Sequence, residues 1–99
     1  MVKKTVPLNK TNINKLSNDK PATYLIITEQ GRVNYAGVAK RNRLQERLIE
    51  HLPGATDYVP GTRVQIVQHP TIEIARKHET KLIKKHQPVH NKQGKIKIS

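Results

Sequence analysis

One carboxylate, that of Glu79, occupies a position where helical spacing predicts an apolar side chain. In the segment 71–91, the apolar face of the predicted helix contains Ile72, Ala75, Leu82, Ile83 and His86. A carboxylate in such a stripe is destabilising unless it is paired, hydrogen-bonded or bound to a metal. Two interpretations are open. Glu79 pairs with a nearby lysine or arginine, or it binds Mg²⁺, a hard cation often held by one or two carboxylates, substrate oxygens and water.

Tyrosines, arginines and a histidine lie at spacings that could complete such a site. Tyr24 and Tyr35 fall on two consecutive β-prone runs, so cross-strand proximity is expected, although both could instead fill the core of a protein without phenylalanine. Arg43, Arg47 and His51 are spaced by four residues and lie along one face of a predicted helix. This row is either a solvated flank or a phosphate clamp, for which the planar guanidinium is well suited.

Together these residue types suggest phosphodiester cleavage. A metal and a cation could stabilise the charge that develops on the phosphate, while a phenol oxygen helps to activate a water molecule. The histidines predict no zinc site, because none pair at the spacing of a closed site and the chain has no cysteine. With only three aromatic residues, stacking on bases is not expected to be the main source of nucleic-acid affinity.

The composition indicates one small domain that binds a polyanion. The chain has 99 residues, with 19 Lys and Arg against 7 Asp and Glu, and a formal net charge of +12. Such an excess points to nucleic acid, although ribosomal-type and membrane-surface proteins share it. The absence of cysteine excludes disulfides, and no apolar run is long enough for a membrane span. We therefore expect a soluble, cytoplasmic protein without membrane association or a small-molecule cofactor.

The first elements that must position these residues are a β-hairpin and a helix. Residues 23–28 and 32–37 are β-prone runs, and Gly31 between them can supply the positive φ of a hairpin turn. A four-residue apolar repeat predicts an amphipathic helix over 41–52. The residues of this repeat are Leu44, Leu48 and Leu52.

The next elements are one strand and one helix. Residues 63–68 form a third short strand, and Thr71 offers an N-cap for a helix that ends before Pro88. The predicted order is therefore β-β-α-β-α. It gives a small mixed sheet with two packed helices over the domain 21–92.

The two ends of the chain are predicted to lie outside this domain. Residues 1–20 are polar and basic, and we expect a flexible arm that adds charge attraction or docks on the domain or on a substrate. Residues 93–99 are expected to form a basic tail or a short edge strand.

These residues resemble the motifs of the GIY-YIG nuclease superfamily. ATY at residues 22–24 keeps the tyrosine of the first half-motif, and YAG at residues 35–37 keeps the tyrosine and the glycine of the second. RLIEH at residues 47–51 resembles the family's Arg-x-x-x-His. Residues 79–91 are similar to the glutamate-to-asparagine segment of the nuclease domain at the N-terminus of the bacterial excision-repair incision protein. The positions in register there are Glu79, Leu82, Ile83, Pro88 and Asn91.

The resemblance implies an α+β fold, with a small three-stranded antiparallel sheet flanked by helices, and Mg²⁺-dependent cleavage of DNA at a single-metal site. Mn²⁺ could substitute for Mg²⁺. By matching position, Glu79 would bind the metal and Arg47 would stabilise the scissile phosphate. Tyr35 would assist in activating the attacking water, and Tyr24 and His51 would line the site.

Four further residues are assigned supporting positions by the same resemblance. Gly37 belongs to the second half-motif, and Asn91 would hold the architecture of the site through hydrogen bonds. The interval between the second motif tyrosine and the arginine is two residues longer than is common, which leaves Arg43 as a rival catalytic arginine. Val38 replaces a polar residue that often follows the motif glycine, and Lys40 could take its place.

We therefore expect a small, standalone endonuclease whose affinity for DNA is salt-dependent and largely independent of sequence. Specificity would come from DNA structure, from the loop 52–63 or from a protein partner. The alternatives are a weakly active or inactive nucleic-acid-binding module on the same fold, and a basic structural protein of a ribosome-like assembly. The residues expected to contact nucleic acid are Arg43, Lys84, Lys85 and Lys92.

Overall fold

The computed structural model describes residues 3–91 of the chain. Its strands are β1 (Lys3–Pro7), β2 (Ala22–Ile27), β3 (Val33–Ala39) and β4 (Arg63–Gln68). Its helices are α1 (Lys10–Ile13), α2 (Leu44–Ile49), α3 (Ile72–His86) and the short 3₁₀ helix η1 (Val89–Asn91). The tail 93–99 and Lys92 lie outside the described residues.

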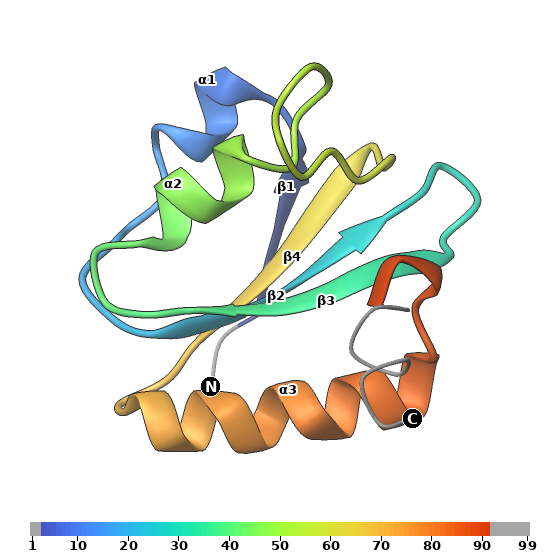
Figure 1. The fold of residues 1–99 in the computed structure, drawn as a ribbon. Coiled ribbons are helices and arrows are strands. Elements are labelled where there is room, and N and C mark those ends of the chain that lie inside the picture. The colour runs from blue at the N-terminus through green and yellow to red at the C-terminus, as the bar shows by residue number, and fades with distance from the viewer. Residues whose placement is uncertain (1–2, 92–99) are drawn as a thin grey trace.

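The strands form one antiparallel sheet in the order β1-β4-β2-β3. The expected α+β class and antiparallel sheet are thus confirmed, but the sheet has four strands rather than three. The additional strand is β1, which pairs along its whole length with β4. Figure 1 shows α1 and α2 on one face of the sheet and α3 lying across the other.

The described part of the segment 1–20 is folded, contrary to the flexible arm expected from the sequence. Ile13 and Leu16 are buried in the same apolar cluster as the leucines of α2. The side chain of Asn9 caps α1 by accepting a hydrogen bond from the Asn12 backbone N–H at 2.9 Å. Strand β1 gives little sequence signal because its side chains are mostly exposed, and the backbone ladder to β4 holds it in place.

The hairpin predicted from the two β-prone runs is confirmed as β2 and β3. Gly31 adopts φ +90° in the connection, a conformation that residues with a side chain rarely adopt. The register of the ladder places Tyr24 opposite Gly37 and Ile26 opposite Tyr35. These four side-chain positions therefore lie on the same face of the sheet, because alternate residues of a strand point to one side.

The two predicted helices form, but α2 is shorter than expected. Helix α3 begins after Thr71, whose side chain accepts a hydrogen bond from the Ile74 N–H at 3.2 Å, and ends at Gln87 with φ +46°. Helix α2 covers half of the predicted range 41–52. Asn42 has φ +68°, which is incompatible with a right-handed helix, so α2 begins only after this residue.

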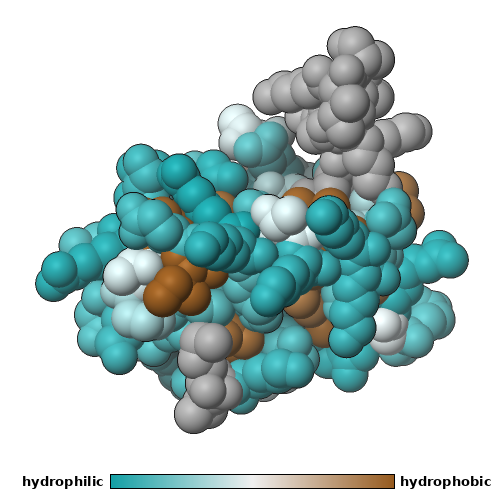
Figure 2. All heavy atoms as spheres, turned by 90° about the horizontal axis from the view of Figure 1, so that it is seen from below, coloured by the Kyte–Doolittle hydropathy of each residue, from teal (hydrophilic) through white to brown (hydrophobic). Residues whose placement is uncertain are grey.

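Hydrophilic side chains cover most of the face that α3 occupies, and hydrophobic ones show only between them (Figure 2). In the part of the chain that the structure describes, no helix is long and apolar enough to cross a membrane.

We expect that Ile13→Ala lowers the free energy of unfolding by about 2–5 kcal/mol, because it removes a fully buried side chain from the core. Lys15→Ala, in the same segment but exposed, should change it by less than about 0.5 kcal/mol. Urea unfolding of the three proteins measures both values. Equal stabilities of the Ile13 variant and the wild type would mean that this segment does not belong to the folded core.

Candidate active site at the edge of strand β3

Two tyrosine rings converge above Gly37 on the sheet face that packs against α2. The ring centroids of Tyr24 and Tyr35 are 6.0 Å apart. A Cβ atom at position 37 would lie 2.5 Å from Cζ and the hydroxyl oxygen of Tyr24 and 2.7 Å from Cε2 of Tyr35. These distances are too short for any real contact, so a side chain at position 37 would displace the rings. Glycine is required here by the packing of the two tyrosines.

His51, just beyond the end of α2, fixes the hydroxyl group of Tyr24. Its Nδ1 lies 2.8 Å from the backbone carbonyl oxygen of Asp57, and its Nε2 lies 2.9 Å from the Tyr24 hydroxyl. Because a carbonyl can only accept, Nδ1 carries the proton, and Nε2 of the neutral ring then accepts from Tyr24. Burial lowers the pKa of His51, which favours this neutral form.

The tyrosines also remain protonated at neutral pH. Burial raises the pKa of Tyr24 and that of Tyr35, and the nearby positive charge of Arg47 opposes this change in both. The Tyr24 proton is already donated to His51. Tyr35 makes ring contacts with Tyr24 and with His51, the latter at a centroid distance of 4.7 Å, and its side chain also borders a pocket. Tyr35 is therefore the tyrosine whose hydroxyl is available to a ligand.

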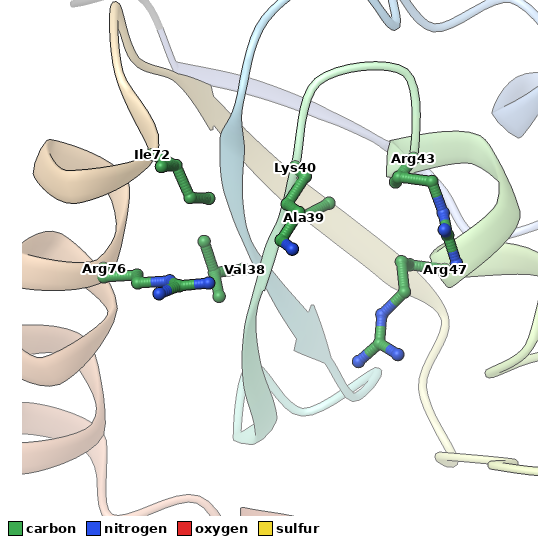
Figure 3. Close-up of a pocket in the computed structure, with 7 residues that line it drawn as sticks. All are labelled: Val38, Ala39, Lys40, Arg43, Arg47, Ile72 and Arg76. Carbon is green, nitrogen blue, oxygen red and sulfur yellow. The ribbon is translucent and has the colours of Figure 1, made fainter.

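Arg47 brings a positive charge to this cluster from the last turn of α2. Its Nε is buried and has no hydrogen-bond partner among the described residues, and its nearest carboxylate oxygen, from Glu50, is 3.5 Å from a terminal nitrogen. A buried donor without a partner is destabilising, and an anion beside it would remove that deficit. Figure 3 shows Arg47 reaching from α2 toward β3.

The rival arginine, Arg43, has a different environment. Its guanidinium forms a 2.6 Å ion pair with Glu46, and its side chain is 52% exposed, against 35% for Arg47. Arg47 alone of the two is close enough to both motif tyrosines to affect their pKa values. The geometry thus places Arg47 within the tyrosine cluster and Arg43 beside it.

Glu79 approaches the same edge from the opposite face of the sheet, because α3 packs there. Its side chain is half-buried, and burial raises its pKa, while the charges of Arg76 and Arg47 act in the opposite direction. Within residues 3–91 its carboxylate makes no ion pair and no hydrogen bond. The ion-pair interpretation of Glu79 is therefore not realised in the described part of the chain.

The surroundings of Glu79 fit a cation that takes a single protein carboxylate. No group of three or more His, Cys, Asp or Glu among the described residues could hold a metal ion. Mg²⁺ keeps several water ligands and is commonly bound by one or two carboxylates together with substrate phosphates. A half-buried carboxylate that has no ion pair within residues 3–91 and is influenced by the charges of Arg76 and Arg47 fits such a site and does not fit a closed zinc site.

Two pockets open beside β3, and Arg47 borders both. One, of about 650 Å³, is lined by Tyr35 and His51 together with the exposed side chains of Tyr58 and Val89. The other, of about 230 Å³, is lined mainly by basic and aliphatic side chains, including Lys40 and Arg43. Arg47 therefore lies where the two pockets meet, with Tyr35 and His51 in the larger one.

Other residues selected from the sequence lie farther out or are only partly described. Lys84 and Lys85 are exposed in the last turn of α3. Asn91 ends η1, and its side chain is outside the described part of the structure. Lys40 follows β3 and is exposed. The sequence analysis missed Arg76, although its helical spacing to Ile72 and Glu79 places the three on one side of α3.

Comparison with known proteins shows similarity to one nuclease domain. No protein-family model and no curated protein matches the chain. Among solved structures, it is similar to the GIY-YIG N-terminal endonuclease domain of UvrC from Thermotoga maritima bound to magnesium as its catalytic divalent cation. The identity is 26% and the TM-score 0.61, over 81% of this chain and 96% of that one. A tyrosine-to-phenylalanine point mutant of the same domain gives 25% identity and a TM-score of 0.61 with the same coverage.

We expect the protein to lose stability as pH falls through and below about 6.5, the ordinary pKa of histidine. Because burial lowers the pKa of folded His51, the unfolded chain binds the proton more readily, and the free energy of unfolding declines in acid. His51→Gln should be less stable at pH 8 but should depend less steeply on pH between 7 and 5. The difference in slope can reach at most about 1.4 kcal/mol per pH unit. Urea unfolding across this range tests it, and parallel curves would contradict a neutral, buried His51.

Proposed function

Because this chain is a GIY-YIG-like protein, we propose that it is a Mg²⁺-dependent endonuclease that hydrolyses phosphodiester bonds of DNA. One observation carries the proposal. Glu79 on α3 and Arg47 on α2 come from opposite faces of the sheet to the same strand edge, where the charge of Arg47 acts on Glu79 and the Nε of Arg47 is buried without a hydrogen-bond partner among the described residues. A half-buried carboxylate with no ion pair or hydrogen bond among the described residues, within range of a guanidinium that keeps one buried donor unpaired, is poorly suited to stability alone. It is well suited to a cation and a phosphate that arrive together.

Glu79 would hold the metal ion, with Mn²⁺ able to substitute for Mg²⁺. When bound, the divalent cation supplies positive charge that stabilises the negative charge developing on the phosphate oxygens. Burial raises the pKa of Glu79, and a neighbouring cation would lower it and favour the ionised carboxylate.

Arg47 would bind the scissile phosphate from the other side. Its buried Nε–H and its terminal N–H groups can donate to non-bridging oxygens, in the bidentate geometry that guanidinium offers to phosphate. Such a donor is effective when it is already oriented before the charge develops. Packing in α2 and the two tyrosine rings provide that orientation.

Tyr35 would position the attacking water. Because its pKa is raised, the phenol stays neutral and acts through hydrogen bonds rather than as a phenolate base. Its hydroxyl can accept from the water while it donates elsewhere. Tyr24 and His51 would position Tyr35 rather than contact the water. The hydrogen bond between them fixes the Tyr24 ring, against which Tyr35 packs.

DNA is the substrate that the charge of the chain supports. The net charge of +12 favours a polyanion, and exposed Arg43, Lys84 and Lys85 would add salt-dependent affinity around the site. Lys92 would contribute in the same way.

We expect Glu79→Gln to reduce cleavage of DNA by about 100-fold or more, because the amide keeps the shape of the side chain but loses its charge for the metal. Labelled single-stranded, duplex and branched DNA, each with Mg²⁺ or EDTA, give the rates. The matched control is Glu73→Gln, an exposed carboxylate in the first turn of the same helix, which should cut like the wild type.

Two results would count against this assignment. Wild-type rates for Glu79→Gln would remove Glu79 from the metal site. Failure of the wild-type protein to cut any of the substrates with Mg²⁺ or Mn²⁺ would instead favour an inactive nucleic-acid-binding module on this fold.

Substitution of Arg47 should slow cleavage far more than substitution of Arg43. We expect Arg47→Ala to lower kcat/KM by about 10²–10³-fold, because it removes a buried donor aimed at the phosphate. Arg43→Ala should lower it by less than about tenfold, because Arg43 is exposed and paired with Glu46. Single-turnover cleavage of one duplex substrate by both variants tests the order. A larger loss for Arg43→Ala would reverse the assignment.

A further inference from the structure

The smaller pocket at the edge of β3 is unusually rich in positive charge. Among the described residues, seven line this pocket, and they include four cations and no carboxylate. The cations are Lys40, Arg43, Arg47 and Arg76. Figure 3 shows Lys40 at the end of β3, between Arg76 on one side and the two arginines of the α2 region on the other.

An anion that enters the pocket would be attracted by all four cations. Like charges gathered around a cavity of about 230 Å³ repel one another, and among the four the structure gives only Arg43 and Arg47 a carboxylate partner. Val38, Ala39 and Ile72 supply aliphatic walls between the cations, and cations that line one hollow attract an anion together.

The pocket also lies in line with the reaction centre. On α3, Arg76 precedes Glu79 by three residues, which is one turn and about 4.5 Å along the helix axis. Ala39 at the end of β3 and Lys40 just beyond it follow Gly37, above which the tyrosines meet. From the cationic pocket, α3 therefore runs to Glu79, and β3 leads back to Tyr35, which borders the larger pocket. Arg47 lies between the two pockets and borders each of them.

We propose that the cationic pocket binds the backbone phosphate next to the one that is cleaved, and that Lys40 and Arg76 are its principal ligands. The inference rests on the proposed nuclease function and extends it. The substrate strand would cross the end of β3 beside Ala39, with one phosphate at Arg47 and Glu79 and its neighbour at Arg76 and Lys40. Arg47 would contact both, which fixes the strand relative to the metal.

The chain offers matched controls for both ligands. Lys77 neighbours Arg76 on α3 and is exposed, and Arg41 follows Lys40 and is exposed, but neither lines the pocket. Arg76→Gln and Lys40→Gln remove the same charge as Lys77→Gln and Arg41→Gln. A change confined to the first pair cannot be explained by general electrostatic attraction.

The first measurement is binding, which does not depend on activity. Fluorescence anisotropy with a labelled 12-nucleotide single strand, in a Glu79→Gln background, gives the Kd of each variant. We expect Arg76→Gln and Lys40→Gln to weaken binding by about five- to tenfold and to reduce the salt dependence by about one counterion each, while the controls change Kd less than about twofold. Equal losses in the pocket variants and the controls would overturn the proposal.

The second measurement locates the phosphate. A neutral methylphosphonate is placed at each linkage in turn around the mapped cleavage position, and single-turnover rates are measured. For the wild type and Lys77→Gln, neutralising one linkage beside the scissile one should slow cleavage about tenfold. For Arg76→Gln the same substitution should have little further effect, because the two changes remove the same contact. Additive losses would show that Arg76 does not bind that phosphate.

Competition with inorganic phosphate shows whether the pocket binds a DNA strand or a free anion. Millimolar phosphate that displaces the 12-nucleotide strand from the wild type but not from Arg76→Gln would indicate a site for the free ion and overturn the strand assignment. If the wild-type protein binds DNA as expected but cuts nothing, the proposed activity fails, while the binding measurements still decide whether this pocket holds a phosphate.

Discussion

Strand β3 lies at the edge of the sheet, and this single topological fact makes the site possible. Helices α2 and α3 pack on opposite faces of the sheet, so a continuous sheet would keep their side chains apart. At the edge strand they can approach the same point from both sides. Arg47 and Glu79 do so closely enough for the charge of each helix to act on the other. An edge strand is ordinarily a liability for aggregation, and here helices and basic side chains flank it.

The hairpin provides the second constraint, through the pairing of Tyr24 with Gly37. Because position 37 has no Cβ, the two tyrosine rings can approach, and His51 closes over them with hydrogen bonds at both of its nitrogens. The cluster is neutral throughout, since burial raises the pKa of the phenols and lowers that of the imidazole. The hydrogen bonds of Tyr24 and His51 make this neutral cluster a rigid support, and Arg47 beside it carries a permanent positive charge.

A second buried hydrogen-bonded group lies under α3 and has no assigned role. Thr23 bonds to Nε2 of His69 at 3.0 Å and to Nδ1 of His78 at 2.8 Å, and burial lowers the pKa of both histidines. These contacts join β2, the β4–α3 connection and α3 itself. They fix the helix that carries Glu79 against the sheet, so the polar core on this face supports the geometry of the edge.

The hairpin, the long helix and most candidate site residues are determined by local sequence patterns, and the sequence was sufficient to predict them. The hairpin follows from two β-prone runs around Gly31, and α3 follows from its apolar period, the Thr71 cap and Pro88. The tyrosines, Glu79 and the Arg47–His51 spacing also belong to local motifs. Sequence alone left open whether Glu79 forms an ion pair and which arginine lies with the tyrosines, because both depend on the distance between separate elements.

Tertiary structure decided the features that depend on long-range contacts. Strand β1 has no apolar alternation, and it is held in the sheet by its backbone ladder to β4, some sixty residues away in the sequence. Arg76 is an ordinary surface arginine on its own helix and becomes part of a cationic pocket only when α3 lies beside β3 and α2. Local residue patterns determined the elements and most candidate groups. The packing of those elements around the edge strand β3 decided which groups meet. The periodicity of side chains within one element predicts that element, but it does not give its distance from another element.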